Sequence, residues 1–418
     1  MRLTKLSSAL LMCAVMGAGV LSSASAVAAP DPAKIEARKA QKSQTVSEKV
    51  GKAISKAYEM YSADKVNEAI AALQGVEGNS AYDKAFLSRF RGILYSQKDE
   101  ARALKYMEDA IAADVLSFRE HADALRIAGQ LATSAKQYEK AIKLLNAYID
   151  FTGEYDPMTY LRIAIAYTEL KQYPKVIAAA DLAIKHKKEN RKEPYGLKLN
   201  AYYELKQIGN AVKVAEQMVE LFPAEKQFWV TLGGLYSANE QPEKALVVLE
   251  MAYKQGLLVK ENDIKTLANA YAQNDIPFKA AAILEKHLKS GLIKAERPIL
   301  STIANNYQAA REFARAADFY GQVAKLTNDG EIYRRQGNAL ILAEKFDQAV
   351  VVLQKAMEVG VKDKGKLHLD LVDAYYSADK FKEAYRHALA AQAAGQAKAG
   401  GQWATAIKER AKARKIEI

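Results

Sequence analysis

The chain has 418 residues, a formal net charge of +12 and one cysteine, Cys13. A single cysteine so close to the start excludes intramolecular disulfides, cysteine-ligated metals and thiol catalysis in the rest of the chain. A lipoprotein interpretation of Cys13 is disfavoured, because the three residues before it lack the small side chains of such a cleavage site. No other segment is apolar enough to cross a bilayer, so we expect the mature protein to be soluble.

Residues 1–28 have the pattern of a secretory signal peptide. A basic start is followed by the apolar run Ala9–Leu21, and overlapping small-residue cleavage sites come next. The run has 13 residues, whereas a membrane-spanning helix needs about 20. We predict cleavage after Ala26 or Ala28. The short processing region is typical of a bacterial export signal, so the predicted location is the periplasm.

Residues 29–47 are polar and show no apolar stripe, which predicts a flexible N-terminal segment. Loss of Arg2 and Lys5 with the signal lowers the net charge from +12 to +10. Both ends of the mature chain remain rich in lysine and arginine. Outside the cytoplasm, this favours anionic lipid head groups or acidic protein segments over nucleic acid. The alternative is a solvated surface that binds nothing.

A helical-repeat pattern is clearest in residues 229–252, WVTLGGLYSANEQPEKALVVLEMA. Trp229, a Leu-Gly pair and Tyr236 are followed by Ala245 and, four residues later, by Leu249. This is the tetratricopeptide (TPR) pattern of a helical hairpin. Gly233 and Ala245 are small where the two backbones cross, and the larger side chains fill the space on either side. One hairpin cannot bury its own apolar face, so it needs copies on both flanks.

The copies are present at a nearly constant period. The small residue of the second helix recurs ten times from Ala69 to Ala384, at an average spacing of 35 residues, against about 34 for this repeat. These positions are Ala69, Ala103, Ala141, Val176, Ala211, Ala245, Ala280, Ala316, Ala349 and Ala384. The matching first-helix positions are Ala57, Gly92, Gly129, Ala164, Leu199, Gly233, Ala268, Ala304, Gly337 and Val372. They precede their partners by 12 residues, except in the Gly92/Ala103 unit, where the spacing is 11.

The pattern therefore predicts an all-α fold, a right-handed superhelical solenoid of about ten TPR hairpins with a C-terminal capping helix. The solenoid is expected over residues 48–394. In residues 395–418, Trp403, Ile407 and Ala411 follow at four-residue spacing with basic residues turned elsewhere. We interpret this segment as the polar-backed cap. The alternative is a basic amphipathic helix that lies on a membrane surface.

Motifs of catalysis are absent from the sequence. The histidines His121, His186, His287, His368 and His387 fall in different units, and no HExxH, GxSxG or phosphate-binding loop is present. His287 and His368 fall at helix-packing positions, which favours a core or groove role over ligation. We predict that the protein is not an enzyme and uses no cofactor or metal.

A row of polar side chains is predicted to line the concave face. The position after the small first-helix residue points into the groove of such a solenoid, and it is occupied by Asn200, Asn269, Asn305 and Asn338. An amide both donates to and accepts from a peptide backbone, so this row is suited to hold an extended chain regardless of its sequence. Four residues before two of these asparagines stand Lys265 and Arg334, which would add a carboxylate contact. The alternative is that these polar side chains only keep the groove hydrated and bind no ligand.

The row matches the carboxylate clamp of TPR cochaperones imperfectly. Thr302 stands where such a clamp has Asn, and Glu331 where it has Lys. A C-terminal carboxylate is therefore disfavoured as the ligand.

Several linking segments that lie outside the TPR pattern resemble one family. They are DFTGEYDPMTYLRIAIAY at residues 150–167, MAYKQGLLVKENDIKTLANAYAQNDIPFKAAAILEKHLKSGLI at 251–293 and YDKAFLSRFRGILYSQKDEARALKYMEDAIAADVLSF near the start of the solenoid. They are similar to periplasmic TPR proteins associated with TonB systems of marine gammaproteobacteria. The resemblance covers nearly all of the mature chain. It implies an auxiliary component beside TonB, ExbB and ExbD in the uptake of iron complexes, and it supplies no defined binding residues.

Two functions from different classes are compatible with these observations. The first is a periplasmic interaction scaffold of a TonB system that holds an extended partner segment, such as a Pro-rich spacer, in its groove. The second is an envelope assembly or chaperone-like factor that binds outer-membrane or cell-wall clients. A spacer without a ligand is a more distant third.

Overall fold

The computed structural model describes residues 30–42 and 44–418, and the predicted signal peptide lies outside this range. The described residues contain α-helices and no strands. They divide into two compact units, which meet in sequence at Lys206 and Gln207. None of the described helices combines the length and the hydropathy needed to cross a membrane.

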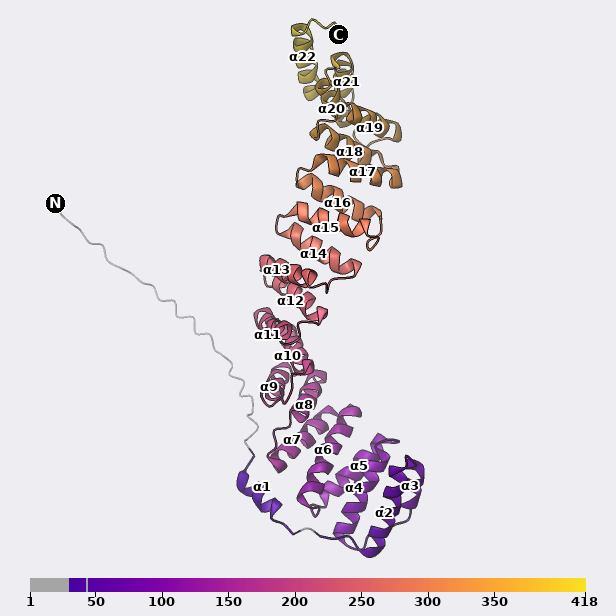
Figure 1. Cartoon of the computed structure of the whole chain (residues 1–418), viewed down its shortest axis with the longest axis vertical. Coiled ribbons are helices and arrows are strands. Elements are labelled where there is room, and N and C mark those ends of the chain that lie inside the picture. The colour runs from indigo at the N-terminus through magenta and orange to yellow at the C-terminus, as the bar shows by residue number, and fades with distance from the viewer. Residues whose placement is uncertain (1–29, 43) are drawn as a thin grey trace, which may run out of the picture. The chain divides into compact units, whose positions relative to one another are not determined.

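Unit 1 holds the first ten helices (Figure 1). Their bounds are α1 Pro32–Lys39, α2 Glu48–Ser62, α3 Val66–Ala72, α4 Ala81–Tyr95, α5 Glu100–Ala112, α6 Phe118–Ser134, α7 Tyr138–Thr152, α8 Pro157–Glu169, α9 Tyr173–Lys185 and α10 Lys192–Glu204. In this unit, α3, α5, α7 and α9 are the second helices of hairpins, and each packs on the helix before it.

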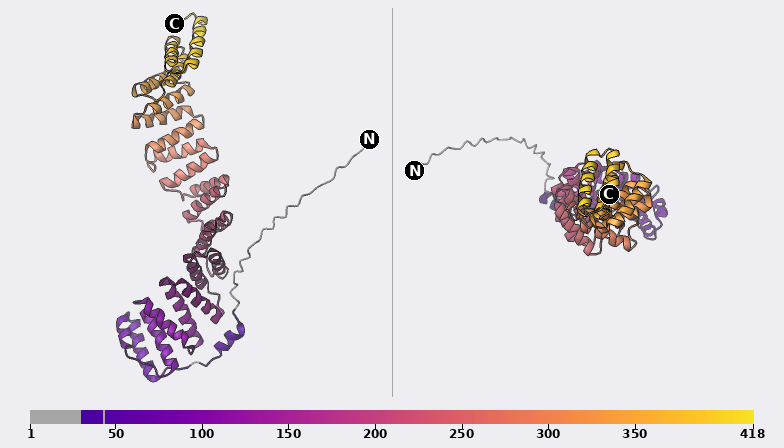
Figure 2. Two further views of the ribbon diagram at one scale, coloured as in Figure 1. Left: turned by 180° about the vertical axis from the view of Figure 1, so that it is seen from behind. Right: turned by 90° about the horizontal axis from the view of Figure 1, so that it is seen from above.

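Unit 2 holds the other twelve described helices. Their bounds are α11 Ile208–Leu221, α12 Lys226–Ala238, α13 Pro242–Lys254, α14 Glu261–Gln273, α15 Pro277–Lys289, α16 Arg297–Ala309, α17 Phe313–Thr327, α18 Gly330–Leu342, α19 Phe346–Val359, α20 Lys364–Ser377, α21 Phe381–Ala393 and α22 Ala397–Ala413. The hairpins of this unit stack in chain order, as the view from behind also shows (Figure 2).

The predicted hairpin register is confirmed by burial. All ten small second-helix residues are buried, and so are the matching first-helix residues except Leu199, which is half-buried. A Cβ atom added at Gly233 would lie only 3.0 Å from Cγ of Leu249. The glycine is therefore needed where α12 and α13 cross, because a larger residue would displace the leucine.

A left-handed residue closes most of the turns between the paired helices. Its φ lies between 55° and 62° in nine turns, at Asp64, Lys136, Lys171, Lys206, Glu240, Asp275, Arg311, Glu344 and Asp379. The α4–α5 turn has no such residue in this structure. This is the unit in which the small residues Gly92 and Ala103 stand 11 positions apart instead of 12. The shorter spacing is thus explained by a different turn.

Residues 29–47 are predicted to be flexible, but the structure contains the helix α1 within this segment. It is capped by Asp31, and the side chain of Ile35 is only 7% exposed. The Arg38 guanidinium donates to the carbonyl oxygens of Asp150 and Phe151, at 3.3 and 3.4 Å. No apolar stripe is visible in the sequence of this segment because Ile35 is the one buried residue of α1.

The C-terminal helix α22 caps unit 2. Its predicted apolar side is buried on α20 and α21, with Ile407 and Ala411 almost fully covered and Trp403 edge-on to Tyr376. The guanidinium of Arg414, just beyond α22, pairs with a carboxylate of the α20–α21 turn at 2.6 Å. Because the apolar side of α22 is covered by its neighbours, the capping interpretation fits better than the membrane-surface helix.

Candidate functional site

The first helices of the hairpins lie on the inner side of each unit. In unit 1, α2 contacts α4, α6 contacts α8 and α8 contacts α10, and in unit 2, α18 contacts α20. Second helices of successive hairpins make no comparable contacts within the described residues. In a curved stack, the elements on the concave side are the ones that approach each other. The surface formed by the first helices of unit 2 is called the inner face below.

Three of the four predicted asparagines lie on this inner face. Asn269 on α14 and Asn305 on α16 are exposed, and Asn338 on α18 is half-buried. Asn200 is exposed on α10 and belongs to unit 1. At the equivalent position of α12 stands Gly234, and a Cβ added there would meet no atom within 4 Å. The row in unit 2 therefore contains an open place at Gly234, followed by three amides.

The three amides differ in how much hydrogen-bonding capacity they keep. The side chain of Asn269 has no hydrogen bond to another described residue. Oδ1 of Asn305 accepts from the Tyr320 hydroxyl of its own hairpin at 2.7 Å, which leaves the NH₂ group available to a ligand. Asn338 hydrogen-bonds Asp370 of the next first helix. The capacity to bind a peptide backbone is therefore concentrated at Asn269 and Asn305.

The two predicted cations are already paired within the chain. Nζ of Lys265 lies 2.6 Å from Glu261 on the preceding turn of α14. Nε of Arg334 donates to Asp370 at 2.5 Å, and both side chains are about four-fifths buried, with 21% and 18% exposed. Burial raises the pKa of Asp370, and the Arg334 guanidinium partly offsets this. A ligand carboxylate would have to compete with these partners, so the predicted ligand contact of Lys265 and Arg334 stays a prediction.

The two residues that depart from the cochaperone clamp are also engaged. The Thr302 hydroxyl donates to the carbonyl oxygen of Pro298 in its own helix at 2.9 Å. The Glu331 carboxylate accepts from the backbone N–H of Lys362 at 2.9 Å. Neither side chain is arranged to hold a ligand carboxylate.

The structure also contains ion pairs between successive first helices, which the sequence analysis did not predict. Besides Arg334 and Asp370, Lys226 on α12 pairs with Asp263 on α14 at 3.1 Å. In unit 1, Arg89 on α4 pairs with Asp123 on α6 at 3.2 Å. The partners stand 34 to 37 positions apart, or about one repeat. That spacing between opposite charges is the signal that would have revealed them.

Recurring first-helix tyrosines connect three hairpins of unit 2 to the helix that precedes each of them. The hydroxyls of Tyr236, Tyr271 and Tyr307 donate to Glu216, Glu250 and Glu285, each on the preceding second helix. A cation of the following helix lies over each ring, namely Lys244, Lys279 and Arg315. Burial and the carboxylate together raise the pKa of Tyr236 to about 12. These tyrosines are thus committed to packing and hydrogen bonding within the unit.

The histidines are also engaged with neighbouring side chains. The His287 ring lies 2.9 Å from the Tyr253 hydroxyl, and Nδ1 of His368 lies 3.0 Å from Nδ1 of His387. Among the described residues there is no group of three or more side chains suited to hold a metal ion. The predicted packing role of His287 and His368 agrees with these contacts. The expectation that all five histidines fall in different repeats is wrong for His368 and His387, which lie on α20 and α21 of one hairpin.

No family model matches the sequence. No curated protein matches it either. Solved structures with a similar fold include the C-terminal part of a TPR repeat-containing protein from Cytophaga hutchinsonii, 14% identical over 58% of this chain and 98% of that one, with a TM-score of 0.37. A TPR protein from Parabacteroides merdae is 14% identical over 62% and 99%, with a TM-score of 0.37. YrrB, described as a TPR protein with an unusual peptide-binding site, is 18% identical over 45% and 91%, with a TM-score of 0.35.

The fold class follows from the hairpins themselves. Paired helices, small residues at the crossings and a repeat of about 35 residues define an all-α TPR solenoid, which ends in a capping helix. The described chain is a TPR protein in this structural sense. Its periplasmic location and its association with TonB stay predictions.

Proposed function

We propose that the protein is an interaction scaffold that holds an extended partner segment on the inner face of unit 2. The observation that carries this proposal is the row of Gly234, Asn269 and Asn305 on three successive first helices. Gly234 leaves space for a partner side chain, and the two amides have hydrogen-bonding groups that the chain itself does not use. An extended backbone presents donors and acceptors at regular intervals, which suits such a row.

The finer proposal is that this scaffold is an auxiliary component of a periplasmic TonB–ExbB–ExbD system for iron-complex uptake. It is supported by the signal-like residues 1–28 and by the resemblance of the linking segments. A Pro-rich spacer is the expected kind of ligand, because it is already extended and loses little entropy on binding.

An envelope assembly or chaperone-like factor is the second candidate. It is favoured by the pairing of Lys265 and Arg334 within the chain. With these charges neutralised, mainly amides remain to contact a ligand, and amides bind a backbone with little regard to its sequence. Such a surface would accept many clients.

Site-specific crosslinking in the native cell envelope tests the site and its partner together. A photoreactive residue at Asn269 would probe the inner face. The matched control would place it at Val247, which is exposed on the second helix α13. We expect TonB, ExbB or ExbD to be captured from position 269 and not from 247. Capture of many unrelated outer-membrane proteins from 269 would favour the second candidate, and capture only from 247 would contradict the inner-face site.

Two sets of variants test the mechanism with the captured partner. Gly234→Trp should block the inner face without disturbing the fold, because its Cβ has open space, whereas Val247→Trp adds the same side chain elsewhere on that hairpin. Asn269→Ala with Asn305→Ala should weaken binding about tenfold or more, since each lost hydrogen bond costs about 0.5–1.5 kcal/mol. The melting temperature should not fall. Unchanged affinity in both sets would show that the row does not bind.

A further inference from the structure

At several junctions between successive hairpins, the connecting loop carries a buried apolar residue. Leu116 between α5 and α6, Leu258 between α13 and α14, and Ile293 between α15 and α16 are 5%, 3% and 2% exposed. Leu258 and Ile293 belong to the buried cluster that runs through unit 2, and Leu116 clusters with Tyr82 and Ala85 of α4 and Ala110 of α5. Such a buried loop residue acts as a seal that excludes water from between the hairpins.

The α7–α8 junction is sealed in a different way. Its loop begins with Gly153, and the Ile35 side chain of α1 occupies the space where a Cβ of that glycine would stand, 2.6 Å from Cδ1. Arg38 fixes the orientation of α1 through the carbonyl oxygens at the end of α7. A short separate segment thus supplies the apolar side chain that this loop lacks. Unit 1 therefore shows that such a junction can accept an external helical segment.

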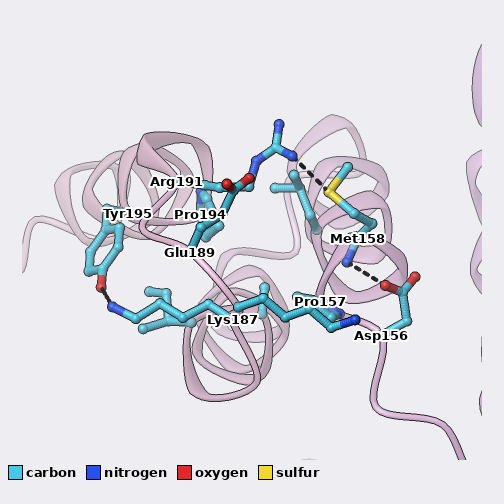
Figure 3. A pocket seen from close by; sticks show the side chains of 12 residues that line it. Asp156, Pro157, Met158, Lys187, Glu189, Arg191, Pro194 and Tyr195 are labelled. Carbon is cyan, nitrogen blue, oxygen red and sulfur yellow. Dashed lines mark hydrogen bonds between the residues drawn. The ribbon is translucent and has the colours of Figure 1, made fainter.

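The α9–α10 junction has neither kind of seal. Its loop, residues 186–191, carries no aliphatic side chain, and all of it except the half-buried His186 is exposed. A cavity of 440 Å³ lies there (Figure 3), within the range of about 300–1,000 Å³ of small-ligand sites. It is lined by Asp156, Pro157, Met158, Leu161, Ala183, Ile184, Lys187, Lys188, Glu189, Arg191, Pro194 and Tyr195.

The floor of this cavity is apolar and its rim is mainly basic. The buried apolar residues of the lining include Leu161, Ala183 and Pro194. On the rim, Lys187 donates to the Tyr195 hydroxyl at 2.9 Å, and Arg191 pairs with Glu193 at 3.1 Å and reaches the Met158 sulfur (Figure 3). The two acidic lining residues are already engaged: the Asp156 carboxylate caps α8, and Glu189 lies near Arg191.

Lys188 is the rim cation that makes no ion pair or hydrogen bond within the described chain. Its ammonium is thus available to a ligand carboxylate. A segment like α1 would not suit this cavity, because the last turn of α1 carries the cations Arg38 and Lys39. A basic segment would be repelled from a rim with three cations and two acids.

We propose that the α9–α10 junction is a second binding site, which takes one bulky apolar side chain flanked by carboxylates on a short partner segment. The apolar side chain enters the cavity and acts as the missing seal. The flanking carboxylates contact Lys188 and the neighbouring rim cations. This site lies in unit 1, and it is independent of the inner face of unit 2.

The test uses the full mature chain and a fluorescent peptide with the sequence Asp-Glu-Leu-Phe-Glu-Asp. Two comparison peptides each lack one of the two recognised features. Asn-Gln-Leu-Phe-Gln-Asn has no carboxylate side chains, and Asp-Glu-Ser-Ser-Glu-Asp has no apolar side chains. Fluorescence anisotropy at two salt concentrations measures binding. We expect the first peptide to bind at least about tenfold more tightly than either comparison peptide, with a loss of affinity at high salt.

A matched pair of charge reversals locates the site. Lys188→Glu should weaken binding of the first peptide about tenfold. Lys185→Glu changes the same charge on the exposed last turn of α9, outside the cavity lining, and should weaken it less than about twofold. Met158→Trp should reduce binding by filling the cavity, with the melting temperature measured as a check on folding.

Three outcomes would overturn the proposal. One is equal weakening by Lys188→Glu and Lys185→Glu, which would indicate non-specific attraction to a basic loop. Another is equal binding of the serine peptide, which would show that the cavity takes no apolar side chain. The third is binding of phosphatidylglycerol vesicles, lost in Lys188→Glu, without binding of the peptide. The inner-face variants Gly234→Trp and Asn269→Ala should leave peptide binding unchanged, so the two sites can fail separately.

Discussion

The two units share one repeat pattern, yet their apolar cores are continuous to different degrees. In unit 2, the buried apolar residues form one cluster that extends from Trp229 to Ala411. In unit 1, the described buried residues form separate clusters, such as the one around Ala141 and the one around Leu145. The burial of the repeat positions is thus alike, but the continuity between hairpins is not.

Buried loop residues contribute to the continuity of the core in unit 2. Leu258 and Ile293 are themselves members of the large cluster, so each joins the cores of two neighbouring hairpins. In unit 1, Ile35 of α1 packs at the α7–α8 loop beside a buried cluster that already includes residues of both helices, and the α9–α10 junction holds a cavity. The repeat pattern therefore determines how a hairpin forms, and buried loop residues such as Leu258 and Ile293 add to the apolar contact between hairpins.

The largest expected effect comes from replacing a buried alanine by tryptophan at a hairpin crossing of each unit. Ala280→Trp in unit 2 and Ala141→Trp in unit 1 both overfill a fully buried hairpin crossing and should cost at least about 3 kcal/mol. Hydrogen exchange followed by mass spectrometry would show where protection is lost. We expect loss over many helices of unit 2 for Ala280→Trp, and loss near α5–α8 for Ala141→Trp. Losses of equal extent would contradict the difference in continuity.

The junction seals provide the next test. Ile293→Ala removes a seal that belongs to the continuous core and should lower the free energy of unfolding by about 2–4 kcal/mol. Ile35→Ala should cost only about 1–2 kcal/mol, because α1 can detach and limit the loss. Urea unfolding measures the first effect, and exchange rates of residues 32–39 measure the second. A larger global loss for Ile35→Ala would mean that α1 is integral to unit 1.

The sequence predicted the hairpins well because their determinants are local. A small residue on each helix and a bulky one four positions later can be recognised within a single repeat, and these residues are buried at nearly every position. The exception is Leu199, which is half-buried and lies in the last helix of unit 1. Apart from Val372, it is the only bulky residue at the first-helix position of the pattern.

What the sequence did not predict depends on contacts between repeats. The docking of α1 requires Gly153, which is more than 100 positions away. The partners of Asn305 and Arg334 come from neighbouring helices, so the sequence shows two polar residues where the structure has already used part of their capacity. The cavity at α9–α10 lies beside a loop that lacks an aliphatic residue, but the α17–α18 loop also lacks one, so the sequence does not show which junction holds a cavity.

Acid provides a smaller perturbation near the C-terminal end of unit 2. Burial lowers the pKa of His387 to about 4, the neighbouring His368 adds to this, and burial also lowers the pKa of His368. The unfolded value is about 6.5, so the unfolded state binds more protons between these values and stability falls as the pH falls through this window. Allowing for partial exposure, we expect a loss of about 1 kcal/mol.

Urea unfolding at pH 7.5 and pH 4.5 measures this loss. His387→Gln should make the unfolding free energy less dependent on pH, with its remaining acid sensitivity due to other groups such as the buried His121 of unit 1. An unchanged pH dependence in His387→Gln would show that the histidine pair does not contribute.

The smallest expected effect concerns the turns, which are alike in both units. Glu240 in unit 2 and Lys136 in unit 1 have φ values of 56° and 57°, a conformation that costs a residue with a Cβ about 1 kcal/mol relative to glycine. Glu240→Gly and Lys136→Gly should therefore each stabilise the protein by about 0.5–1 kcal/mol. The control is Lys98→Gly in the α4–α5 turn, where no residue has a positive φ, and this change should destabilise. Similar gains at Glu240 and Lys136 in thermal unfolding would show that the units differ in the coupling of their hairpins and not in the turns that form them, whereas a gain at Lys98 would mean that glycine acts there for another reason than backbone conformation.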